Sequence, residues 1–112
     1  MSIPFSVTPA LRSGTFTSPI LTYQAGQTNI YFEIVLPNAS DYNDVTKSIT
    51  VTFTRNGHPS ATLIQFPPGG RLAPGVIPID YDISQFTAGD QIQISAALSA
   101  QMTVGIQNGL IS

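Results

Sequence analysis

Charged side chains are scarce in this sequence. Only 9% of its 112 residues are Asp, Glu, Lys or Arg, against roughly 25% in an ordinary soluble domain. The four basic residues are scattered along the chain: Arg12, Lys47, Arg55 and Arg71. Nucleic acids and anionic membrane surfaces are recognised by clustered cations. Neither is therefore expected as a partner.

Cysteine and tryptophan are absent altogether. Without cysteine the chain has no disulfide, no thiolate metal site and no cysteine nucleophile. The N-terminal residues lack the basic segment and apolar run of a signal peptide. No stretch approaches the roughly 20 apolar residues of a membrane span. We therefore expect a protein made in the cytoplasm, with one domain over residues 1–112.

The chain does contain a repeated alternation of apolar and neutral polar residues, the latter mostly Thr, Ser, Gln and Asn. Alternation with a period of two is typical of strands with one buried face. About eight short segments are predicted as strands on this basis. They are 3–8, 15–23, 28–36, 48–54, the residues after Gly57, 76–83, 91–98 and 101–107. This pattern predicts an all-β fold, an antiparallel β-sandwich of jelly-roll type.

The hairpin around Asn56 and Gly57 allows two registers. A two-residue type I′ turn would place Val51 opposite Thr62. A three-residue loop with Gly57 in the left-handed region places Val51 opposite Ala61 and matches the apolar faces better. We therefore predict the three-residue loop. Its pairs are Ile49 with Leu63, Val51 with Ala61, and Phe53 with Pro59.

Catalysis has little support in these residues. The single histidine, His58, stands next to Pro59 at the hairpin tip, and no nucleophile motif accompanies it. Asp80 and Asp82 project from one face of a strand, an arrangement that can bind a cation or divide acid and base roles. More often such a pair is a solvated face that discourages edge pairing. We therefore expect no enzyme activity and no cofactor.

The segment Asn38–Asp44 is the densest group of oxygen-bearing side chains. Loops of Asp and Asn can ligate Ca²⁺. The EF-hand pattern fails here because Thr46 and Thr52 stand where it needs Gly and Glu. Asp and Asn are also the ordinary residues of turns. The turn interpretation is favoured, and no metal site is assigned.

Two parts of the chain are candidate interfaces with other proteins. They are the hairpin tip, Arg55, Asn56, Gly57 and His58, and the apolar tail, Leu110 and Ile111. Such a tail can add to the sheet edge of a neighbouring protein, or pack on its own sandwich. Neutral polar side chains also avoid the ionic desolvation penalty when a partner buries them. The surface therefore favours a protein that acts by contact.

A short, cysteine-free β domain that is rich in Thr and Gln, poor in Lys and without a signal peptide resembles the small accessory proteins of bacteriophage particles. The resemblance extends over the whole chain in composition and strand pattern, without a diagnostic motif. It implies a structural virion protein made in the host cytoplasm, a capsid decoration or cement protein or a minor tail component. Its partners would be the major capsid or other particle proteins, and it would form a homo-oligomer such as a trimer.

The alternative function is a carbohydrate-binding module. The segment Asp82–Ile94 is similar to one in jelly-roll sugar-binding sandwiches, where an Asp-Leu-Ser-x-Tyr turn precedes a glycine and an alternating strand. This resemblance implies the fold more than a sugar site. Four tyrosines are candidates for a sugar platform, although core or rim positions are favoured for most of them. They are Tyr23, Tyr31, Tyr42 and Tyr81.

Overall fold

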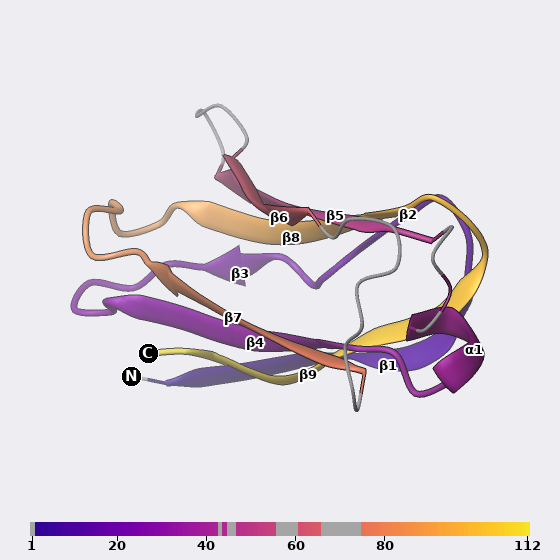
Figure 1. Cartoon of the computed structure of the whole chain (residues 1–112). Coiled ribbons are helices and arrows are strands. Elements are labelled where there is room, and N and C mark those ends of the chain that lie inside the picture. Colours follow the sequence, from indigo (N-terminus) through magenta and orange to yellow (C-terminus); the bar gives the residue numbers. More distant parts are fainter. Residues whose placement is uncertain (1, 43, 45–46, 56–60, 66–74) are drawn as a thin grey trace.

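Two antiparallel β-sheets lie face to face in this protein (Figure 1). The computed structural model describes residues 2–42, 44, 47–55, 61–65 and 75–112, with the backbone alone for Tyr42 and for residues 61–65. Within these ranges the single helix is α1 (Ala39–Tyr42), which lies at one end of the sandwich. No helix in the described part is long and apolar enough to cross a membrane.

The first sheet contains four strands in the order β1-β9-β4-β7, and the second contains β2-β8-β5-β6 with β3 also paired to β8. The first sheet is formed by β1 (Ile3–Arg12), β9 (Met102–Ile111), β4 (Asn29–Val35) and β7 (Val76–Asp82). The second is formed by β2 (Thr15–Thr17), β3 (Leu21–Thr22), β8 (Gln91–Leu98), β5 (Ile49–Arg55) and β6 (Ala61–Gln65).

The strands β2 and β3 are two halves of one edge strand, since both pair with β8. Pro19 lies between them and has no N–H to donate to a ladder. Ser18 bridges the gap: its Oγ accepts a hydrogen bond from Ile94 N at 3.0 Å, and its N donates to Ile94 O at 2.8 Å. The sequence predicts one strand over residues 15–23 that a proline interrupts, a feature that favours a sheet edge, and the structure divides the segment there into β2 and β3.

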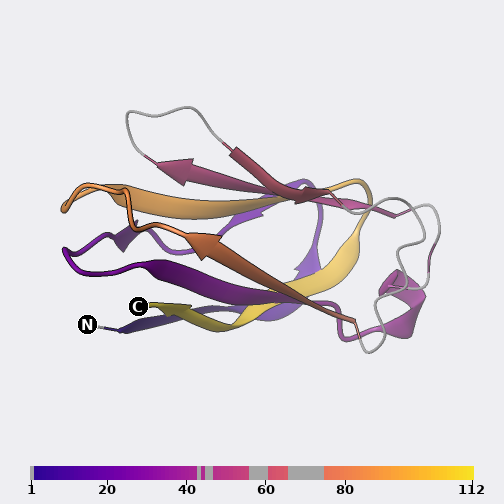
Figure 2. The same ribbon diagram turned by 60° about the vertical axis from the view of Figure 1, so that its left-hand side comes forward.

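With β2 and β3 counted as one, the described strands occupy eight positions, and the two sheets have the orders 1-8-3-6 and 2-7-4-5. The chain therefore crosses to the other sheet after every strand except between β5 and β6. Figure 2 shows these crossings from a second side. This is the eight-strand arrangement of a jelly roll. The predicted fold is confirmed.

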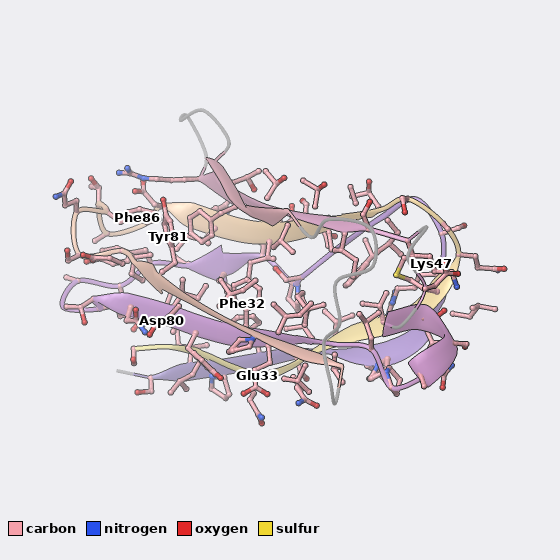
Figure 3. The ribbon with its side chains drawn as sticks, viewed as in Figure 1. Phe32, Glu33, Lys47, Asp80, Tyr81 and Phe86 are labelled. Carbon is pink, nitrogen blue, oxygen red and sulfur yellow. The ribbon has the colours of Figure 1, made fainter. Side chains whose placement is uncertain are left out.

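Apolar side chains of both sheets fill the space between them. In β4, Phe32 is fully buried, whereas Glu33 is half-buried on the outer face (Figure 3). Burial of each large apolar side chain contributes about 1.5–3 kcal/mol. Alternation predicts an inner face for β4, β5, β8 and β9, and all but one of its members in these strands are buried; the exception, Leu98, is half-buried against the core. The buried ones are Ile30, Phe32, Ile34, Ile49, Val51, Phe53, Ile92, Ile94, Ala96, Met102, Val104 and Ile106.

The prediction that the last strand ends at residue 107 is wrong, because β9 continues to Ile111. Asn108 adopts a φ of 54°. Around this residue the register of β9 shifts against both of its neighbouring strands, β1 and β4. Such a bulge resets the alternation, so Ile106 and Ile111 both point inward despite their odd spacing. Ile111 is fully buried and pairs with Ile3 and Ile30. The tail packs on its own sandwich, and Ile111 is not available to a neighbouring sheet.

The predicted register of the β5–β6 hairpin is also wrong. Phe53 pairs with Ala61 instead of Pro59, and past a bulge Val51 pairs with Ile64. Between the turn and the bulge the shift is two residues, which matching of apolar faces does not detect. Past the bulge the shift is three residues. The bulge adds one residue on the β6 side, and the prediction assumed an uninterrupted ladder.

Gly105 of β9 lies too close to β1 for any side chain. A Cβ at this position would lie 2.5 Å from Val7 O and 2.6 Å from Pro9 N, both backbone atoms. Gly105→Ala is therefore expected to lower the free energy of unfolding by about 1–3 kcal/mol, as in overpacked cores. Urea denaturation followed by circular dichroism measures this change. Ser6→Ala, at an exposed position of β1, is the control; equal stability of the two variants would contradict the close approach.

Candidate functional site

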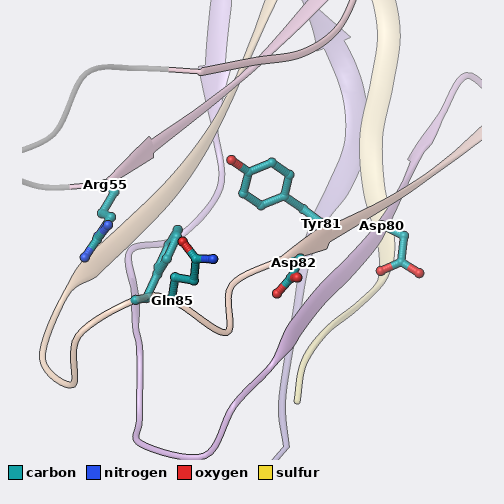
Figure 4. Close-up of a pocket in the computed structure, with 6 residues that line it drawn as sticks. Arg55, Asp80, Tyr81, Asp82 and Gln85 are labelled. Carbon is teal, nitrogen blue, oxygen red and sulfur yellow. The ribbon is translucent and has the colours of Figure 1, made fainter.

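A pocket of about 530 Å³ opens near the end of the sandwich where β7 leads into residues 83–90 (Figure 4). Both sheets contribute to it, since Arg55 ends β5 and the remaining described lining residues belong to β7 and the turn that follows. The lining residues are Arg55, Asp80, Tyr81, Asp82, Gln85 and Phe86.

Aromatic rings form the apolar wall of this pocket. The buried Phe53 ring lies 4.7 Å from Tyr81 and 5.7 Å from Phe86, measured between centroids. Tyr23 supports Phe86 from a further side at 5.9 Å. Such tilted arrangements are the favourable ones for aromatic pairs. The core thus extends without interruption into the wall of the pocket.

Arg55 is held in place by two contacts. Its Nε donates to Asp90 Oδ2 at 2.6 Å, and its guanidinium carbon lies 4.4 Å from the centre of the Phe86 ring. The same Asp90 oxygen accepts a hydrogen bond from Thr87 N at 3.0 Å. A charge-assisted bond and a cation–π contact together restrict the planar guanidinium to one orientation.

The two aspartates of β7 lie on its exposed side. Asp82 Oδ1 accepts a hydrogen bond from Ser84 N at 2.8 Å. The backbone and side-chain hydrogen bonds from Ser84 hold the pKa of Asp82 below its ordinary value. Asp80 is exposed and also lines the pocket. The sequence predicted a solvated face for this pair, and both residues are exposed and line the pocket.

A second polar cluster lies on the outer face of the first sheet, next to the pocket. Glu33 accepts hydrogen bonds from the Tyr31 hydroxyl and from Gln107 Nε2 and Asn108 Nδ2, the last two at 2.9 Å. The Tyr31 bond is the main cause that lowers the pKa of Glu33 and raises the pKa of Tyr31. Tyr31 pairs with Asp80 in the β4–β7 ladder, so the cluster and the pocket are adjacent.

The oxygen-rich segment at residues 38–44 has a structural role at Asp41. Its Oδ1 accepts a hydrogen bond from Lys47 Nζ at 2.8 Å, and its Oδ2 accepts one from Thr103 N at 2.9 Å. The Asp41 bond raises the pKa of Lys47. Asp41 thereby ties α1 to β9. The described residues include no group of three or more His, Asp or Glu side chains placed to hold a metal.

The predicted interface residues are separated in the structure. Arg55 lies at the pocket, Leu110 is 38% exposed on the outer face, and Ile111 is in the core. Asn56, Gly57 and His58 lie outside the described residues, and so does the conformation predicted for Gly57. These positions do not form one surface within the described part of the chain.

Sequence reasoning missed two lining residues of the pocket, since Gln85 and Phe86 were interpreted only as a turn. Tyr81 is among the tyrosines predicted as candidates for a sugar platform, with a core or rim position favoured. It is half-buried, packs against the core and lines the pocket. Of the other tyrosines, Tyr23 is buried and Tyr31 lies on the outer face; the side chain of Tyr42 is outside the description. A signal was available in the aromatic and amide residues of the turn that directly follows the two aspartates.

No family model and no curated protein matches this sequence. The fold is similar to that of TmCBM61, solved in complex with β-1,4-galactotriose, with a TM-score of 0.50 and 12% identity over 95% of this chain and 66% of that one. It is also similar to part of an exo-β-1,3-galactanase from Phanerochaete chrysosporium solved with galactose, with a TM-score of 0.44 and 16% identity over 95% of this chain and 28% of that one. At these identities the likeness shows the fold.

These comparisons correct the expectation of a structural virion protein. The match with a TM-score of 0.50 is to TmCBM61, solved with a bound galactotriose, and this finding contradicts a capsid decoration, cement or tail role. The phage resemblance depended on composition, and a neutral β-sandwich surface is not specific to particle proteins. The β-sandwich itself is confirmed. Self-association and the absence of enzyme activity stay predictions.

The Glu33 cluster is expected to make stability depend on pH at both ends of the scale. The folded-state pKa of Glu33 lies below its ordinary value of 4.5. The contribution of Glu33 to the free energy of unfolding is therefore complete above pH 4.5 and is lost as the pH falls through the folded-state pKa. The pKa of Tyr31 is raised above 10.0, so its contribution is complete below that value and is lost as the pH rises through the folded pKa.

Glu33→Gln is therefore expected to flatten the acid side of a plot of melting temperature against pH, measured by circular dichroism. Asp82 also has a lowered pKa, so it contributes in the same acid range. Asp82→Asn is the matched variant that measures this second part. An acid slope that is unchanged in Glu33→Gln would show that the cluster does not stabilise the fold.

Proposed function

We propose that this domain is a carbohydrate-binding module that acts without catalysis. The observation that carries the proposal is the pocket, where carboxylates, an amide and a fixed guanidinium stand beside aromatic rings. Sugar hydroxyls both donate and accept hydrogen bonds, and these side chains supply both kinds of partner. Apolar walls with a few convergent polar groups are typical of small-molecule sites.

Each lining residue has a distinct role in this proposal. Asp80 accepts hydrogen bonds from sugar hydroxyls, and the exposed Gln85 amide donates and accepts them. Arg55 donates through nitrogens other than the Nε that Asp90 already engages. Tyr81 and Phe86 pack against the apolar face of a sugar ring.

Two further observations support the proposal. The turn at Asp82–Ile94 resembles the corresponding segment of sugar-binding jelly rolls, and it forms one side of the pocket. The fold is similar to that of TmCBM61, which was solved with β-1,4-galactotriose. That trisaccharide is therefore the first ligand to test.

Binding without cleavage is proposed because of the environment of Asp82. Hydrolysis of a glycosidic bond needs a carboxylic acid with a raised pKa as proton donor. Hydrogen bonds from Ser84 shift the pKa of Asp82 in the opposite direction. Asp82 is thus unsuited to the role of general acid.

Isothermal titration with β-1,4-galactotriose is expected to detect binding that Asp80→Ala and Gln85→Ala each weaken by about tenfold, or about 1.4 kcal/mol. Both side chains are exposed, so the melting temperature is expected to stay unchanged. Thr17→Ala, on β2 in the other sheet, is the control and should bind as the wild type does. Chromatography of the incubated trisaccharide should reveal no shorter product. Absence of binding to every sugar on a glycan array would refute the proposal.

A further inference from the structure

Carboxylates dominate the charge of the pocket. Asp80 and Asp82 line it from β7, and Arg55 is the one cation among the described residues that line it. The charge of Arg55 is already balanced by Asp90, whose Oδ2 lies 2.6 Å from its Nε. The described lining of the pocket therefore carries negative charge that Arg55 does not neutralise.

The other described cations are engaged elsewhere. Lys47 lies beside α1 at the far end of the sandwich and pairs there with Asp41 and Asp44 (Figure 3). Arg12 ends β1 and donates to backbone carbonyls of β1 and β9. Charges separated by more than about 10 Å are largely screened at moderate salt. Neither cation compensates the two aspartates of the pocket.

The two aspartates have different environments. Asp82 accepts hydrogen bonds from Ser84, which favour its ionised form and lower its pKa. Asp80 faces Tyr31 across the β4–β7 ladder, and its negative charge adds to the larger effect of Glu33 in raising the pKa of Tyr31. Asp82 is thus engaged by the turn that follows β7. Asp80 is exposed and lines the pocket, so it is the carboxylate that we expect to meet a ligand.

We propose that the pocket selects uncharged glycans and rejects glycans that carry carboxylate or sulfate groups, with Asp80 as the residue that sets this preference. The inference rests on the proposed glycan binding. A hydroxyl group donates a hydrogen bond to a carboxylate. An anionic group at the same place meets charges of its own sign and gives up its hydration, and Arg55, the one cation of the described lining, already shares its charge with Asp90.

Two trisaccharides of equal length test this inference: neutral β-1,4-galactotriose and anionic trigalacturonate. In isothermal titrations at neutral pH and low salt, the wild type is expected to bind the neutral sugar at least roughly tenfold more tightly, because like charges oppose the anionic one. Added NaCl should reduce this ratio through screening. Asp80→Asn retains the shape of the side chain and removes its charge, so it should reduce the ratio by about threefold or more.

Asp44→Asn is the matched control, since it removes one negative charge beside α1 and should leave the ratio of affinities unchanged. Trigalacturonate binding as tight as that of galactotriose would overturn the inference. A ratio that Asp80→Asn leaves unchanged, in a variant with the wild-type melting temperature, would overturn it as well. No binding of either sugar by the wild type would instead refute the proposed function on which the inference rests.

Discussion

The apolar layer between the two sheets is the contact on which the other features of this molecule depend. Phe32, Ile94 and Val104 are among the side chains that it buries completely, and they come from β4, β8 and β9. Burial of such area is the main favourable term in folding. Because neighbouring residues of a strand point to opposite faces, burial of one set also determines which residues reach the surface. Phe53 continues this layer into the pocket, where it supports Tyr81 and Phe86.

Several of the few charged side chains form hydrogen bonds that connect separate elements of the fold. Asp41 joins α1 to the start of β9, and Glu33 collects three hydrogen bonds over the bulge in β9. Arg55 and Asp90 close the end of the sandwich beside the pocket. A neutral surface thus has a small number of charged positions, and the negative ones at the pocket stand out electrostatically against it.

The same neutral surface misdirected the functional interpretation. Uncharged strand faces are inexpensive to desolvate, which is equally true for a face that packs on a protein and for one that meets a sugar. Composition does not distinguish these two cases because it carries no information on where side chains gather. The fold match to TmCBM61 contradicted the virion role. The grouping of acidic, amide and aromatic residues at one end of the sandwich supports glycan binding as the proposal.

The sequence by itself determined the approximate positions of the strands, most of the inward-facing residues and the jelly-roll class, because these follow from local alternation and turns. Only the tertiary structure decided the register of the β5–β6 hairpin, since matching of apolar faces detects neither a shift of two residues nor a bulge within the ladder. It alone revealed that β9 continues to Ile111 in the core, because a bulge interrupts the alternation at Asn108. The pocket also became visible only in the tertiary structure. Arg55 and Asp90 are 35 residues apart in sequence. They meet because β5 pairs with β8, which begins directly after Asp90. No spacing in the chain encodes that pairing, which depends on how the strands pack around their shared core.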